Sequence, residues 1–94
     1  MNIIRKNSSR SEIYIFQFET QNEFNLYVSS LRKCIEDQSS EELQTIATNV
    51  INRLVSRVDD KYASDEYALS GMLFPGEMTE FAWAMSMMNA LRYI

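Results

Sequence analysis

The sequence predicts an α+β fold, in which an N-terminal β-hairpin packs on three main α-helices in a single small domain, residues 1–94. Three observations lead to this prediction. Near the N-terminus, apolar residues alternate with a period of two. In two later segments, apolar residues recur every three or four positions. The only proline precedes a third apolar segment. A chain of 94 residues supports one hydrophobic core.

The stretch EIYIFQFE, residues 12–19, predicts the main strand. Its two alternating sets are Tyr14, Phe16 and Phe18 on one side and Ile13, Ile15 and Gln17 on the other. Aromatic and β-branched residues at this spacing favour a strand. The stretch NIIRK, residues 2–6, is expected to pair with it, and the polar run from Asn7 to Ser11 would form the turn.

A first helix is predicted over residues 21–36, where the period changes from two to three or four. Thr20 and Glu23 have the spacing of a capping box at its start. A second helix is predicted over residues 41–60. Its apolar positions are Leu43, Ile46, Ala47, Val50, Ile51, Leu54, Val55 and Val58.

Ser39 and Glu42 fit a second capping box before this second helix. Its apolar stripe is the clearest in the chain, so we expect Ile51 and Leu54 to lie in the core. The pattern weakens between Asp59 and Gly76, which predicts a short helix or an irregular connection.

The last helix is expected over residues 76–92, because Pro75 suits the first turn of a helix. At about 100° per residue, one face of this helix is apolar. Its residues are Met78, Phe81, Ala84, Met85, Met88 and Leu91. A second, nearly opposite apolar face carries Trp83, Met87, Ala90 and Ile94. Such a helix is either buried centrally or covered on the Trp83 side by a partner or a second copy.

The missing residue types constrain the chemistry of this chain. It has no histidine and one cysteine, Cys34, which excludes Ser-His and Cys-His nucleophiles and a thiolate metal cluster. Gly71 and Gly76, the two glycines, form no phosphate-binding motif. The stretch DDKYASDE, residues 59–66, lacks the order of a calcium loop. We therefore expect no catalytic residues, no bound metal and no cofactor.

The net charge is −4, but its distribution is uneven. Residues 1–10 carry three basic side chains, whereas residues 11–94 carry six basic and thirteen acidic side chains, a net charge of −7. A body of this sign repels phosphate backbones, which argues against direct binding to nucleic acid and favours a basic macromolecular partner. No apolar run is long enough to cross a membrane, so we expect a cytoplasmic protein.

Most of the acidic side chains fall into two groups near expected helix ends. The first acidic cluster consists of Glu36, Asp37, Glu41 and Glu42. The second acidic cluster consists of Asp59, Asp60, Asp65 and Glu66. Antiparallel helices would place the two clusters at opposite ends of the helical layer. Solubility alone would explain either cluster, but both are also candidate surfaces for a basic partner, with Trp83 and Met87 as the apolar anchor.

Small acidic proteins without catalytic residues often act by occupying the cationic site of a nuclease or nucleic-acid-binding protein. The sequence therefore predicts a non-enzymatic inhibitor of a basic protein such as a toxin or nuclease. An immunity protein or antitoxin is favoured over a phage-type DNA mimic, because a net charge of −4 is modest for a duplex mimic. A third hypothesis is a homodimeric adaptor or structural subunit that is joined through the Trp83 face.

Overall fold

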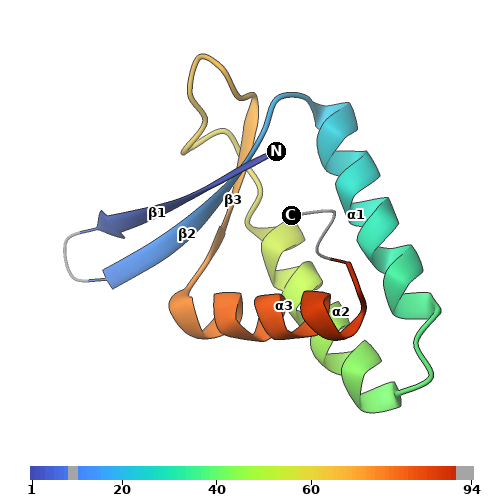
Figure 1. Cartoon of the computed structure of the whole chain (residues 1–94). Coiled ribbons are helices and arrows are strands. Elements are labelled where there is room, and N and C mark those ends of the chain that lie inside the picture. The colour runs from blue at the N-terminus through green and yellow to red at the C-terminus, as the bar shows by residue number, and fades with distance from the viewer. Residues whose placement is uncertain (9–10, 91–94) are drawn as a thin grey trace.

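The computed structural model describes residues 1–8 and 11–90 and confirms the α+β fold, with a β-hairpin at the N-terminus (Figure 1). The elements in chain order are β1 (Asn2–Ser8), β2 (Ser11–Phe18), α1 (Gln21–Glu36), α2 (Glu41–Ser56), β3 (Leu69–Leu73) and α3 (Pro75–Met87). None of the helices in the described part of the chain has the length and apolar character needed to span a bilayer.

The three strands form one antiparallel sheet in the order β1-β2-β3. Strand β2 is therefore central, with Ile15 paired to Ile4 on one side and to Met72 on the other. This explains why Ile15 is buried although it does not belong to the main core cluster. Both alternating sets of β2 residues contain buried side chains, because the strand has a neighbour at each edge.

Strand β3 corrects the expectation of a short helix or irregular connection between Asp59 and Gly76. Helix α2 also ends at Ser56 instead of residue 60. Two backbone hydrogen bonds join Asp59 to Ser70, with N···O distances of 2.9 and 2.8 Å. Because Asp59 pairs with β3 in this way, its backbone is extended and cannot continue the helix.

Helix α3 begins at Pro75, one residue before the expected start, and ends at Met87, short of the expected residue 92. Asn89 adopts a left-handed conformation with φ of 54°. Its N–H donates to the carbonyl of Ser86, and the N–H of Ala90 donates to the carbonyl of Met85. This pair of bonds is the Schellman motif that ends many helices. Leu91 and Ile94, which the sequence pattern assigns to the two apolar faces of this helix, lie outside the described residues.

The helix caps are partly as expected. The hydroxyl of Thr20 accepts from the N–H of Glu23 at 3.0 Å, while the carboxylate of Glu23 accepts from the N–H of Glu19 instead of closing the box on Thr20. The cap of α2 is Ser40, whose hydroxyl accepts from the N–H of Leu43 at 3.2 Å. The expected box of Ser39 with Glu42 was therefore wrong by one residue.

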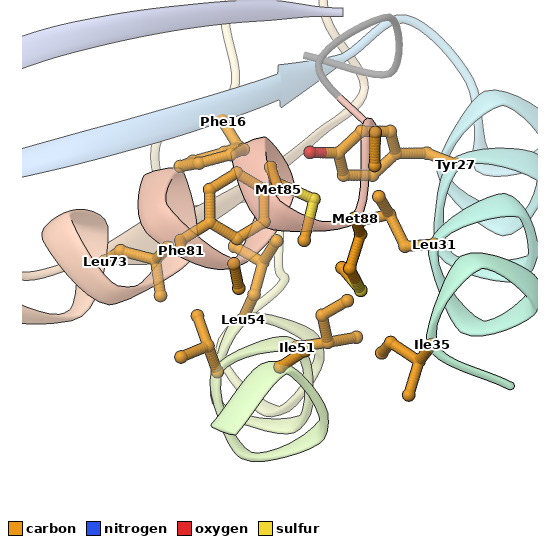
Figure 2. Packing of buried hydrophobic residues seen from close by; sticks show 14 of the residues in the cluster. Phe16, Tyr27, Leu31, Ile35, Ile51, Leu54, Leu73, Phe81, Met85 and Met88 are labelled. Atoms are coloured by element: carbon orange, nitrogen blue, oxygen red, sulfur yellow. The ribbon is translucent and has the colours of Figure 1, made fainter. Parts of the chain in front are cut away.

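The core lies between one face of the sheet and all three helices (Figure 2). Phe16 from β2 meets Phe81 from α3 edge to face, with ring centroids 5.3 Å apart. This geometry is one of the two that aromatic rings prefer. Ile51 and Leu54 are fully buried, which confirms the expected apolar face of α2. Helix α2 therefore contributes to the centre of the core, between α1, α3 and β3.

We expect Gly71→Ala to destabilise the protein by about 1–3 kcal/mol, the usual cost of overpacking a core. A Cβ atom at Gly71 would lie 2.7 Å from Cδ1 of Leu54 and 2.9 Å from Cγ2 of Val58. Gly76→Ala is the matched control, because no atom lies within 4 Å of its added Cβ and the position is helical. Removing a helical glycine should stabilise by about 0.5–1 kcal/mol. Urea unfolding of both variants measures the two effects, and equal signs would contradict this account of β3.

Candidate partner-binding surfaces

The two acidic clusters lie at opposite ends of the helical layer (Figure 1). The first acidic cluster surrounds the turn between α1 and α2, and the second lies on the segment between α2 and β3. All eight side chains of the two clusters are exposed. The structure therefore brings together the members of each cluster in one region but keeps the two clusters apart.

Short-range contacts involve part of the segment that carries the second acidic cluster. A carboxylate oxygen of Asp59 accepts from the N–H of Lys61 at 2.9 Å. The ammonium group of Lys61 lies 5.2 Å from the ring centroid of Tyr62, within reach of a cation–π contact. This positive charge lies beside Asp59 and Asp60 in the chain and offsets part of their negative charge.

Few of the acidic side chains are neutralised inside the molecule. Within residues 1–8 and 11–90, the acids in ion pairs are Glu23 with the Met1 amino group, Glu12 with Arg5, and Glu77 with Arg53 and Arg57. The other ten of the thirteen acids are exposed and make no ion pair with any described residue. Three arginines are thus engaged by only two carboxylates, and no acid of either cluster forms an ion pair with a described residue.

Glu77, in the first turn of α3, is a buried carboxylate that the sequence analysis did not single out. Its oxygens accept from Arg57 at 2.6 and 3.1 Å and from Arg53 at 3.1 Å. It also accepts from the N–H of Phe74 at 3.0 Å and so caps α3. A signal was present in the sequence, because Glu77 follows Pro75 by two positions and Arg53 and Arg57, at the end of α2 and at its C-cap, are four residues apart.

Hydrogen bonding from Arg57 holds the pKa of Glu77 below its ordinary value, although burial opposes this effect. We expect Glu77→Gln to cost about 1.5–3 kcal/mol at pH 7, as charged hydrogen bonds do, nearer the lower figure because Arg53 is half exposed. A lowered folded pKa gives stability that is present above the unfolded pKa, near 4.3, and lost as the pH falls through the folded value.

Urea unfolding from pH 7 to pH 3 tests this linkage. The free energies of unfolding of wild type and Glu77→Gln should converge as the pH falls. Glu80→Gln, an exposed acid on the same helix, is the matched control and should follow wild type throughout. A constant difference between wild type and Glu77→Gln over the whole range would show that the carboxylate is not stabilised by ion pairing.

Trp83 and Met87 are exposed, with 47% and 57% of their surfaces accessible in the single chain. The expectation of a centrally buried helix is therefore wrong for Trp83 and Met87. On the opposite face of α3, Phe81, Ala84 and Met85 are buried. Trp83 and Met87 are one turn apart on α3 and form the α3 apolar stripe. An exposed tryptophan beside a methionine is the composition of many interface anchors.

Two shallow hollows that are open to solvent lie on α1 and α2. The larger, of about 430 Å³, is lined by Glu41, Gln44, Thr45, Thr48 and Asn49. The smaller, of about 150 Å³, is lined by Arg32, Ile35, Glu36 and Thr48. Thr48 lines both hollows, and Glu36 and Glu41 of the first acidic cluster line one each. Sequence reasoning did not find the larger hollow, because polar residues at this spacing are typical of any solvated helix face.

The described residues contain no group of three or more Cys, Asp or Glu side chains placed to hold a metal ion. Two hydroxyls, of Tyr27 and Ser70, are buried without a hydrogen-bond partner in the described part of the chain. Burial raises the pKa of Tyr27, which keeps its hydroxyl protonated. Cys34 is half-buried and packs against the core.

Comparisons with protein families, with curated proteins and with solved structures find no match for this chain. The assignment of a function therefore rests on the charges, exposed side chains and hollows described above.

Proposed function

We propose that this chain is a small, non-enzymatic inhibitor that binds and neutralises a basic protein in the cytoplasm. The favoured partner is a nuclease-type toxin, which would make the chain an immunity protein or antitoxin. One observation carries the proposal: ten exposed acidic side chains make no ion pair with any described residue. Such uncompensated charge attracts a cationic surface and accelerates encounter with it.

The mechanism is occupation of a cationic site by carboxylates in place of phosphates. A nuclease must hold an anionic backbone, and its lysines and arginines are therefore available to Glu and Asp side chains. Charge provides steering and orientation, while a desolvated aromatic anchor provides much of the binding energy. The exposed Trp83 and Met87 on α3 are the side chains to which we assign this anchoring role.

The separation of the acidic clusters favours a toxin over a duplex-binding protein as the partner. A protein that imitates DNA needs negative charge along the path of two phosphate strands, at one charge per about 1.7 Å of helix axis. Here the acids gather at two ends of the helical layer, with a net charge of −4 for the whole chain. A single compact cationic cleft matches one such cluster better than a duplex groove does.

Affinity capture with matched charge reversals tests this proposal. Glu41→Lys and Asp65→Lys each reverse one acid of a cluster, and Glu19→Lys makes the same charge change outside both. Wild type and Glu19→Lys should retain a basic nuclease from the source cell and inhibit the purified enzyme. At least one cluster variant should lose both properties while keeping a native circular dichroism spectrum. Retention of the same proteins by all four would contradict the proposal.

A second candidate function is that of a homodimeric adaptor, which the exposure of Trp83 and Met87 favours. A seam through the α3 apolar stripe would bury both side chains in a two-fold interface. Sedimentation equilibrium at micromolar concentrations distinguishes the two candidates. A dimer that Trp83→Ala converts to folded monomers supports the adaptor, whereas a wild-type monomer excludes it.

A further inference from the structure

We propose that the larger hollow on α2 receives an arginine side chain of the partner. This hollow, called the α2 hollow below, is lined by Glu41, Gln44, Thr45, Thr48 and Asn49. The inference rests on the proposed function and makes it more specific, because it selects the first acidic cluster over the second and names the chemical group that is bound.

The α2 hollow presents hydrogen-bond acceptors. The side-chain amide nitrogen of Gln44 donates to the carbonyl of Ile35 at 3.1 Å and to that of Gln38 at 2.9 Å. These two bonds use both of its N–H groups and fix the amide orientation, which leaves its carbonyl oxygen as a free acceptor. The hydroxyl of Thr45 donates to the backbone carbonyl of Glu41 at 2.9 Å, so its lone pairs also remain available.

The charge of the α2 hollow has the sign that an arginine requires. Glu41 lines it, and its carboxylate makes no ion pair with any described residue. Glu36 lines the adjoining smaller hollow, where the guanidinium of Arg32 donates to the side-chain oxygen of Asn52 at 3.0 Å. Arg32 is the only cation that lines either hollow within the described residues, and it lies on the α1 side.

A guanidinium group matches this set of acceptors better than other side chains do. It presents five N–H donors in a planar fork and no acceptor, so it can bond several oxygens at once. A lysine ammonium is a compact point charge with three donors and is more strongly hydrated. An acid would be repelled by Glu41 and would leave the acceptor oxygens of Gln44 and Thr45 without donors.

The lining also argues for the side chain of a macromolecule over a small-molecule ligand. Sites for small molecules typically enclose most of the ligand and are lined by apolar and aromatic side chains. None of the described residues that line the α2 hollow has an apolar side chain. An inserted arginine would instead gain affinity from the rest of its protein, including contacts outside the hollow.

The test is an NMR titration of the full ¹⁵N-labelled chain with acetyl-tetraarginine amide. We expect saturable amide shifts concentrated at residues 41–49, and at least tenfold weaker binding of acetyl-tetralysine amide. Thr48→Arg, which places a guanidinium in both hollows, should weaken the tetraarginine interaction at least tenfold. Ser86→Arg adds the same charge at an exposed position on α3 and should leave it within twofold.

Shifts spread equally over both acidic clusters, or equal binding of the two peptides, would overturn the arginine assignment. An unfolded Thr48→Arg variant is identified by its amide spectrum, and Asn49→Lys then replaces it with the same expectation. Failure here is distinguishable from failure of the proposed function. If a captured nuclease depends on the first acidic cluster but the peptide does not localise to residues 41–49, only the arginine site falls. If the peptide localises and no basic protein is inhibited, the inhibitor function falls.

Discussion

Leu54→Ala and Ile51→Ala are each expected to lower the free energy of unfolding by about 2–5 kcal/mol. Both side chains are 0% exposed and lie in the core shared by the sheet and the helices. Truncation removes buried methyl groups and leaves a cavity that the surrounding side chains fill only in part. Helix α2 also contacts α1, α3 and β3, so the loss affects most of the domain.

Leu26→Ala is the matched control for these two variants. Leu26 lies on α1 with 61% of its surface exposed, so the same loss of methyl groups leaves no cavity. Its effect should stay within about 0.5 kcal/mol. Denaturant unfolding of the three variants provides the comparison. A loss below about 0.5 kcal/mol at both Leu54 and Ile51 would show that the core has been assigned to the wrong face of α2.

Trp83→Ala should increase the dissociation rate of the partner complex roughly 30-fold or more. A central aromatic anchor contributes about 2 kcal/mol or more to binding, and each 1.4 kcal/mol is a tenfold change. The association rate should change little, because interface truncations act mainly on dissociation. The folding stability should also change little, since nearly half of Trp83 is exposed.

Surface plasmon resonance with the purified partner separates these rates, and Thr79→Ala provides a control at an exposed polar position of α3. If Trp83→Ala instead unfolds the domain, the side chain is part of the core and the α3 apolar stripe is not an interface. If the variant folds and dissociates at the wild-type rate, the anchor lies elsewhere on the surface.

The parts of the fold that depend on local periodicity were predictable from the sequence. The alternation around Phe16 identified β2, and the stripe through Leu54 identified α2. Strand β3 was missed because Ser70 and Gly71 are weak strand formers. What selects Gly71 there is the close approach of Leu54 and Val58, a tertiary contact that no local pattern shows. The end of α3 was missed because an asparagine, Asn89, takes the position where glycine is usual.

The candidate surfaces divide in the same way. The sequence predicted that both acidic clusters are exposed, because helix ends and connections are usually polar. The structure confirms that all eight side chains are exposed. Burial of Glu77 could not be predicted in this way, because it depends on the approach of α3 to the end of α2, where Arg53 and Arg57 lie. The α2 hollow was likewise missed, because its lining residues all lie on α2 at the spacing of an ordinary solvated helix face. For Trp83, the sequence left two alternatives open, and its 47% exposure excludes central burial in the single chain.

The most direct measurement of the central claim is the association rate with the captured basic partner as a function of salt. Exposed charges are screened beyond roughly 8 Å at physiological ionic strength, so the wild-type rate should fall steeply from 20 to about 500 mM salt. Glu41→Lys should associate more slowly at low salt and show a flatter dependence, while Glu19→Lys keeps most of the wild-type slope. A wild-type rate independent of salt, or identical slopes for all three proteins, would contradict the claim that acidic clusters guide this chain to a basic partner.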